Sequence, residues 1–462
     1  MLIRLPPLLL HLYGSIFLTA LLLLLRTASS TTDASDLSVL QAFLKGIENP
    51  SLLPDWSGTD PCGSDWAHIQ CSGSRVTQIQ LKGVGLRGSL PSNLNQLSYL
   101  EQIALQDNSF YGPLPSLSGL SQLSSAYLGA QNFTSIPADF FHGLSSLAVL
   151  SLEDNPLEAW SLPADLASCT SLTTLSLTNT SLTGSIPSFI GNLTLLQELR
   201  LAYNRLSGSL PSSLSSLAQL TRLELNNQAG SGSGTGSLSG PIDVVGLLPS
   251  LKTLWIQVNG FSGSIPASLG SALSLSDCRL NDNDLVGLVP STFSSSTSLT
   301  TFQIQNNKLM GSVPSISSIT AASSYTFSGN KFCVDTVGAS CAPDVNALLA
   351  FLLGVNYPLT LVNSWKGNNP CSSSWQGISC DSQSKNVSAL NLPKSQLTGT
   401  ISPYLGNLTG LAKLVLSGNN LTGTIPASLA DLPSLVLVDV SDNDIYGPVP
   451  AFPSRVSVIV TG

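Results

Sequence analysis

The feature that most constrains this chain is a pattern that recurs about every 24 residues. A representative unit runs from Leu196 to Leu206 and has the form L-x-x-L-x-L-x-x-N-x-L. The spacing between units is 23 to 25 residues, except for one longer step after Gln228 and one gap after Asn330. Stacked units grow without enlarging any single core, so the length of 462 residues need not mean three domains. The position of Asn204 recurs at Val84, Asn108, Gln131, Asn155, Thr180, Asn204, Gln228, Asn259, Asn283, Asn307, Asn330, Ser395, Asn419 and Asn443.

This pattern is similar to that of leucine-rich repeats. Each L-x-L segment is expected to form a short parallel strand, with its leucines inside the solenoid and the intervening residue on the concave face. An asparagine at the following turn can both donate to and accept from backbone groups, which predicts a buried ladder of side-chain amides. The Gly-x-Ile/Leu/Val-Pro segment that follows, as in 184–187, resembles the plant-specific class of these repeats.

Two segments share a plan that differs from the repeats. Apolar residues at helical spacing begin at Asp36 and at Asp344, and each helix pattern is followed by two tryptophans and a cysteine pair. An open solenoid end exposes core leucines, so both segments are predicted to be caps. The expected fold is an α/β solenoid, a right-handed plant-type superhelix of about 14 repeats in two blocks, each with a disulfide-stapled helical N-cap. We expect the short second block to lean on its cap and to move relative to the long one.

The boundaries follow from these features. We predict a signal peptide at 1–29, a cap at 30–75, a first block of about 11 repeats at 76–332 and an island at 333–385. The island holds a closing cysteine pair and the second cap. A block of 3 repeats follows at 386–450, and 451–462 is the start of a truncated repeat. The alternative for the first segment is a membrane anchor, since its apolar run is nearly long enough to span a bilayer.

The cysteines fit an oxidising compartment. Six of the eight are expected to form three local disulfides, Cys62–Cys71, Cys333–Cys341 and Cys371–Cys380. Cys169 and Cys278 lie four repeats apart, beyond disulfide reach, and are predicted to be buried thiols. Six N-x-S/T sequons also favour a secreted glycoprotein; their asparagines are Asn132, Asn179, Asn192, Asn386, Asn407 and Asn420.

Composition argues against several classes of function. Only 10% of residues are charged, against about 25% in soluble domains, and the net charge is −8. Without a basic stretch, nucleic-acid binding is not expected. His68 and His142 are too isolated for a triad or metal site, and 230–236 lacks the spacing of a phosphate loop and is predicted to be a surface insertion. We therefore expect no catalytic site, no metal and no cofactor.

The interrupted array resembles the ectodomain of the transmembrane kinase (TMK) family of plant receptor-like kinases. The resemblance rests on about eleven repeats, an island with Asn369-Pro370-Cys371, Trp375 and Cys380, and three more repeats. It implies a plasma-membrane receptor in auxin-linked growth signalling, with an apoplastic auxin-binding protein or a co-receptor as partner. After Pro450 the chain has neither a second apolar span nor a kinase motif, so we interpret it as a truncated receptor, either an incomplete gene model or a secreted fragment. Membrane association would then need a missing C-terminal span, and this chain would be extracellular.

The concave position of L-x-L supplies the candidate binding residues. In repeats six to nine it is occupied by Arg200, Glu224, Trp255 and Arg279, with Gln257 nearby, and in repeat three by Tyr127. An exposed tryptophan flanked by arginines has the composition of a binding hot spot. The alternative is a cross-strand Arg200–Glu224 ion pair of under about 1 kcal/mol, with Trp255 packed on its neighbours. Two other functions stay open. One is that of a secreted soluble repeat protein, either a decoy receptor or a defence protein resembling polygalacturonase-inhibiting proteins, which have one cap. The other is that of a kinase, if the gene continues.

Overall fold

The structure is a computed structural model that describes residues 31–63, 65–228, 237–372, 374–383 and 385–461. The chain divides into two compact units, one ending at Thr180 and the other beginning at Ser181. This division falls within the predicted first repeat block. The predicted signal peptide and the glycine-rich run 230–236 lie outside the described residues. Within the described ranges, no helix combines the length and the apolar character needed to cross a bilayer.

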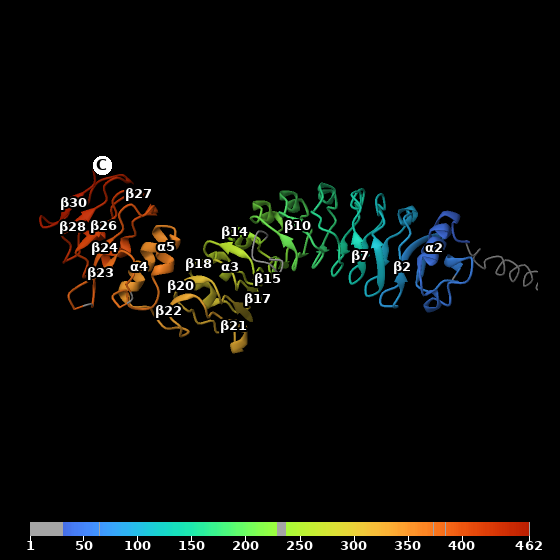
Figure 1. Cartoon of the computed structure of the whole chain (residues 1–462), viewed down its shortest axis with the longest axis horizontal. Coiled ribbons are helices and arrows are strands. Elements are labelled where there is room, and N and C mark those ends of the chain that lie inside the picture. Colours follow the sequence, from blue (N-terminus) through green and yellow to red (C-terminus); the bar gives the residue numbers. More distant parts are fainter. Residues whose placement is uncertain (1–30, 64, 229–236, 373, 384, 462) are drawn as a thin grey trace, which may run out of the picture. The chain divides into compact units, whose positions relative to one another are not determined.

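The first unit is a row of short strands preceded by a helical cap (Figure 1). Helix α2 (Ala34–Gly46) begins at the N-cap Asp33, whose carboxylate accepts the backbone N–H of Ser35. An antiparallel pair then leads into parallel strands, in the spatial order β1-β2-β4-β6-β8-β9. Their bounds are β1 (Ile69–Ser72), β2 (Arg75–Gln80), β4 (Gln102–Ala104), β6 (Ser125–Tyr127), β8 (Val149–Ser151) and β9 (Thr174–Ser176).

The second unit holds two such rows. The first has the order β11-β13-β15-β17-β19-β21 and the second β23-β24-β26-β28-β30, where only β23 and β24 are antiparallel. The first comprises β11 (Glu198–Arg200), β13 (Arg222–Glu224), β15 (Thr253–Trp255), β17 (Asp277–Arg279), β19 (Thr301–Gln303) and β21 (Tyr325–Thr326). The second comprises β23 (Ile378–Cys380), β24 (Val387–Asn391), β26 (Lys413–Val415), β28 (Leu437–Asp439) and β30 (Ser457–Ile459). Helices α4 (Pro343–Gly354) and α5 (Leu359–Ser364) precede this second row. A single turn of helix, α3 (Ala267–Gly270), lies between β15 and β17.

These rows confirm the predicted parallel solenoid, and its core is the one the repeat pattern requires. Leu199 and Leu201 are fully buried on either side of a half-buried Arg200, and the same alternation recurs along the array. Some concave positions are less open than expected: Ala104, Ser151, Ser176 and Glu224 are buried. Strands about 4.8 Å apart let larger neighbours cover small side chains, and Glu224 is covered by its ion-pair partner Arg222.

A second set of short strands was not predicted. They follow the ladder position of every repeat except that of Asn155, and they pair with the same segment of adjacent repeats; Thr183 lies opposite Arg205, for example. Most of their glycines adopt left-handed φ angles, as at Gly184 with φ 81°. These strands are β3 (Arg87–Gly88), β5 (Ser109–Pro113), β7 (Asn132–Ser135), β10 (Thr183–Gly184), β12 (Arg205–Leu206), β14 (Ser239–Pro241), β16 (Gly260–Ser262), β18 (Val286–Leu288), β20 (Lys308–Ser312), β22 (Lys331–Val334), β25 (Thr398–Thr400), β27 (Asn420–Gly423) and β29 (Asp444–Ile445).

The asparagine ladder forms as predicted. Asn307 is buried, and its amide nitrogen donates to the carbonyls of Leu280 (3.0 Å) and Ile304 (3.1 Å). Its amide oxygen accepts the backbone N–H of Leu285 at 3.0 Å. A ladder amide such as that of Asn307 thereby ties its own turn to the preceding repeat, which satisfies backbone groups that burial would otherwise leave unpaired.

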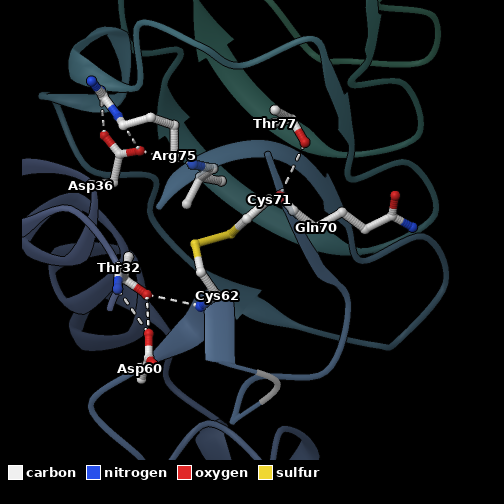
Figure 2. The surroundings of a disulfide bond; sticks show 9 residues. Thr32, Asp36, Asp60, Cys62, Gln70, Cys71, Arg75 and Thr77 are labelled. Atoms are coloured by element: carbon white, nitrogen blue, oxygen red, sulfur yellow. Dashed lines mark hydrogen bonds and ion pairs between the residues drawn. A yellow bond between two sulfur atoms is a disulfide. The ribbon is translucent and has the colours of Figure 1, made fainter. Parts of the chain in front are cut away.

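The first cap is fastened by a disulfide and a buried ion pair. Cys62 and Cys71 are bonded, and Figure 2 shows the Asp36 carboxylate facing Arg75 nearby. Asp36 is fully buried; it accepts the Arg75 Nε and a terminal nitrogen at 3.0 and 2.7 Å, and also the backbone N–H of Val76 at 2.8 Å. On the other side of the disulfide, Thr32 donates to Asp60 and accepts the backbone N–H of Cys62 (Figure 2).

The second cap repeats the stacked tryptophans and the disulfide of the first cap. Trp56 and Trp66 stack with centroids 4.6 Å apart, and Trp365 and Trp375 stack at 5.5 Å. Disulfides join Cys371 to Cys380 and Cys333 to Cys341, so all three predicted bridges are present. Cys169 and Cys278 are free and buried, as expected. Burial raises the pKa of Cys169 to about 11 and raises that of Cys278 further, which keeps both thiols protonated.

The island packs against repeats of the first block within the second unit. One hydrophobic core joins Val286 of β18 and Met310 of β20 to Leu348 and Tyr357 of the island, and continues to Leu414 of the last repeats. The Tyr357 ring lies over Gly287, where a Cβ would come within 2.9 Å of the ring. This shared core argues against the expected mobile joint.

Candidate functional site

Four of the predicted binding residues form one row on the concave face. The strand register places Arg200 opposite Glu224, Glu224 opposite Trp255, and Trp255 opposite Arg279. Gln257 lies two residues beyond Trp255, just after β15. We call Arg200, Glu224, Trp255, Gln257 and Arg279 the concave patch. Tyr127 lies on β6 in the first unit, so the structure does not group it with the others.

The ion pairs of the patch run along the strands. Arg200 pairs with Glu198, and Arg222 pairs with Glu224 at 2.7 Å. Arg279 holds Asp277 through two bonds of 3.0 Å. The alternative of a cross-strand Arg200–Glu224 pair is therefore wrong. Residues two apart share one face of a strand, so each arginine meets an acid on its own strand.

Trp255 is half-buried rather than exposed, because Arg279 covers it. The Arg279 guanidinium carbon lies 4.3 Å from the centroid of the Trp255 ring. Such a cation–π contact contributes about 0.5–1 kcal/mol at a partly exposed site. The contact also fixes the Arg279 guanidinium over the Trp255 ring.

Several polar atoms of the patch are buried without a hydrogen-bond partner among the described residues. They include the donors Trp255 Nε1 and Arg200 Nε and the acceptor Gln257 Oε1. Each such group costs about 1–3 kcal/mol unless it is satisfied. Neighbouring repeats add the acceptors Asn226 Oδ1 and Asn281 Oδ1, which the sequence analysis missed. Their position two residues before a ladder residue, like that of Gln257, is the signal that could have revealed them.

The remaining predicted residues lie elsewhere. The six sequon asparagines are exposed, and none occupies the central position of a concave strand. Attachment of sugars to them stays a prediction. Among the described residues, no group of three His, Cys, Asp or Glu side chains is placed to hold a metal ion.

Family models match both the repeats and the two caps. The leucine-rich-repeat N-terminal domain matches residues 33–72 and again 341–381. Leucine-rich-repeat models match 121–182, 195–217 and 410–432.

Curated relatives match most of the chain. The receptor-like kinase TMK2 of Arabidopsis thaliana is 37% identical over 85% of this chain, and TMK4 of the same plant is 41% identical over 86%. The receptor protein kinase WSS1 of Oryza sativa subsp. japonica is 42% identical over 85%. The chain belongs to the TMK family of receptor-like kinases. It spans 42–43% of the length of these TMK relatives.

Solved structures of plant receptor ectodomains have the same fold as this TMK chain. The Arabidopsis receptor kinase HAESA, in complex with an N-terminally extended IDA peptide hormone, has a TM-score of 0.56 and 25% identity. That match covers 92% of this chain and 73% of HAESA. A second HAESA structure, with IDA and the co-receptor SERK1, has a TM-score of 0.53 and 26% identity and covers 89% and 70% of the two chains.

Proposed function

We propose that this chain is the extracellular recognition region of a plant receptor-like kinase, and that the concave patch binds an extended ligand. The observation that carries the proposal is the set of unpaired donors and acceptors around Trp255. An extended peptide backbone presents N–H and C=O groups in turn, so it can pair with groups of both kinds once the Trp255, Arg200 and Gln257 side chains turn out of their buried positions. The HAESA structures, in which a related ectodomain binds a peptide hormone, support this ligand class.

Partner and location follow from the same proposal. The family resemblance adds an apoplastic auxin-binding protein as a candidate partner, and the HAESA complex with SERK1 adds a co-receptor. Both would meet the chain outside the cell, as the predicted signal peptide, disulfides and sequons require.

The test compares the secreted chain with its W255A/R279A variant. Each protein is immobilised and exposed to apoplastic fluid, retained molecules are identified by mass spectrometry, and their Kd values are measured with purified material. Recombinant auxin-binding protein, with and without auxin, is tested in parallel. We expect the variant to bind at least about tenfold more weakly, since hot-spot residues contribute about 2 kcal/mol or more.

Tyr404→Ala is the control, because Tyr404 is 61% exposed and belongs to the short block. This variant should bind like the wild type. Equal Kd values for the wild type and W255A/R279A would refute a binding role for the patch. Retention of a wall-degrading hydrolase through the patch would support the secreted-inhibitor function instead.

A further inference from the structure

The second cap contains a polar cavity of about 450 Å³. Its lining includes Asp344, Asn369, Asn386, Asn407 and Thr409. This volume falls in the range of small-molecule sites, about 300–1,000 Å³. Asn386 begins the sequon Asn-Val-Ser, and its side chain is exposed at the edge of the cavity.

In the first cap, side chains fill the space that corresponds to this cavity. The Arg75 guanidinium reaches across it to bond Asp36, and it also donates to the Ser98 hydroxyl at 3.1 Å. The guanidinium carbon lies 4.5 Å from the centroid of the Tyr99 ring. One long cationic side chain and one aromatic ring therefore close this part of the cap.

The backbone gives the correspondence between the two caps. Asp36 accepts the N–H of Val76, and Asp344 accepts the N–H of Val387 at 3.1 Å. The residue before each valine is Arg75 in the first cap and Asn386 in the second.

The neighbouring turn agrees with this alignment. The backbone N–H of Glu101 donates to the Thr77 carbonyl in the first cap, and the backbone N–H of Ala412 donates to the Ser388 carbonyl in the second. Thr409 and Gly410 therefore stand where the first cap has Ser98 and Tyr99. The second cap lacks both the guanidinium and the ring, and its cavity lies in the room they would fill.

Asn386 is placed to carry a group into this room. Its Nδ2 donates to Asp381 Oδ2 at 2.9 Å, which uses one of its two hydrogens. A Cβ at Gly410 would lie 2.7 Å from the Asn386 Cβ, so the glycine leaves room for this side chain. The second Nδ2 hydrogen can be replaced while the bond to Asp381 is kept.

We propose that the cavity of the second cap holds the first N-acetylglucosamine of a glycan linked to Asn386, which replaces the Arg75 and Tyr99 side chains of the first cap. Asn386 Nδ2 forms a bond to C1 of the sugar, and the bond from C1 to a lipid-linked pyrophosphate donor breaks. The pyrophosphate leaves with the bonding electrons, and the amide proton passes to solvent. Sugar hydroxyls can then donate to Asp344 and exchange hydrogen bonds with Asn369 and Thr409.

The test uses the full chain, secreted from insect cells behind a heterologous signal peptide, and does not depend on ligand binding at the concave patch. Ser388→Ala removes the sequon, and Ser388→Thr keeps it together with the hydroxyl that bonds the Ser379 carbonyl at 3.2 Å. Peptide mapping should find Asn386 glycosylated in the wild type and in S388T and unmodified in S388A. Hydrogen exchange in β23, β24 and the turn at Asn407 should be about tenfold faster in S388A than in S388T.

Two further comparisons separate the sugar from the hydroxyl. Trimming the wild type with an endoglycosidase that leaves one N-acetylglucosamine should keep its slow exchange, and complete removal with a peptide amidase should produce the fast exchange. Thr134→Ala, which removes the sequon of Asn132, should leave the second cap unchanged. The proposal is overturned if Asn386 is unmodified in the wild type, or if S388A and S388T show the same rates of hydrogen exchange.

Discussion

Arg75 is the side chain of the first cap whose loss should cost most. Asp36 is fully buried, and the Arg75 guanidinium is its cationic partner (Figure 2). Hydrogen bonding to Asp36 raises the pKa of Arg75 above its ordinary value, so the guanidinium stays protonated. Removing one partner of such a pair leaves an uncompensated carboxylate in the core.

We therefore expect Arg75→Ala to destabilise the first cap by about 3 kcal/mol. Hydrogen exchange of α2 and β2, with thermal unfolding beside it, measures the effect. Arg205→Ala is the matched control, since Arg205 is exposed on β12 and should change neither quantity. If both variants show the same hydrogen exchange and thermal unfolding, the buried ion pair contributes little to the stability of the cap.

Val258 is a second residue whose environment predicts an effect, this time stabilising. It has φ 58°, a left-handed conformation that is unfavourable for a β-branched side chain. Asn227 and Asn306 have the same conformation one repeat earlier and two repeats later. Val258→Asn should raise the free energy of unfolding by about 1 kcal/mol, measured by thermal unfolding. Val436→Asn, an exposed valine outside the left-handed region, should give no increase; a gain of the same size there would contradict the explanation.

At the scale of the element, the ladder holds successive turns together. Asn307→Ala removes the bonds to Leu280, Ile304 and Leu285 and leaves their backbone groups unpaired. We expect the local free energy of unfolding to fall by about 2–3 kcal/mol, which hydrogen exchange would detect as faster exchange in β18 and β20. The adjacent Asn306→Gly keeps the left-handed backbone and loses only an exposed bond to Asp282, so it should exchange almost as the wild type does. Equal exchange in the two variants would mean that leucine packing alone fixes the turns.

The duplicated caps show how far one element can diverge on one framework. Both keep the helix, the stacked tryptophans and the disulfide. These parts repeat in the sequence and could be predicted from it. The exchange of Arg75 for Asn386 could not be recognised in the same way, because two extra residues separate Cys380 from Val387 compared with Cys71 and Val76. Only the shared bonds of Asp36 and Asp344 to these valines align the two segments.

At the scale of the second unit, Tyr357 joins the island to the preceding repeats. It is 8% exposed, its ring lies over Gly287, and its hydroxyl accepts the backbone N–H of Leu288. Tyr357→Ala should cost about 3 kcal/mol and increase exchange in both α4 and β18. Tyr357→Phe keeps the ring and should lower the free energy of unfolding much less. If Tyr357→Ala leaves exchange in β18 unchanged, the island is independent of those repeats, as the sequence alone had suggested.

The sequence by itself determined the repeat, the ladder, the caps and the three disulfides. Each depends on residue types at fixed spacing, and one period dictates which leucines are buried and which positions face outward. It also placed Arg200, Glu224, Trp255 and Arg279 on adjacent strands, because the register of parallel strands follows the period.

Only the tertiary structure decided how those side chains are used. It paired each arginine along its own strand, placed Arg279 over Trp255, and left polar atoms such as Gln257 Oε1 unsatisfied. It also brought the island against β18 and β20. Such contacts depend on side-chain reach and on packing between segments far apart in the chain, and a periodic pattern carries no information about either.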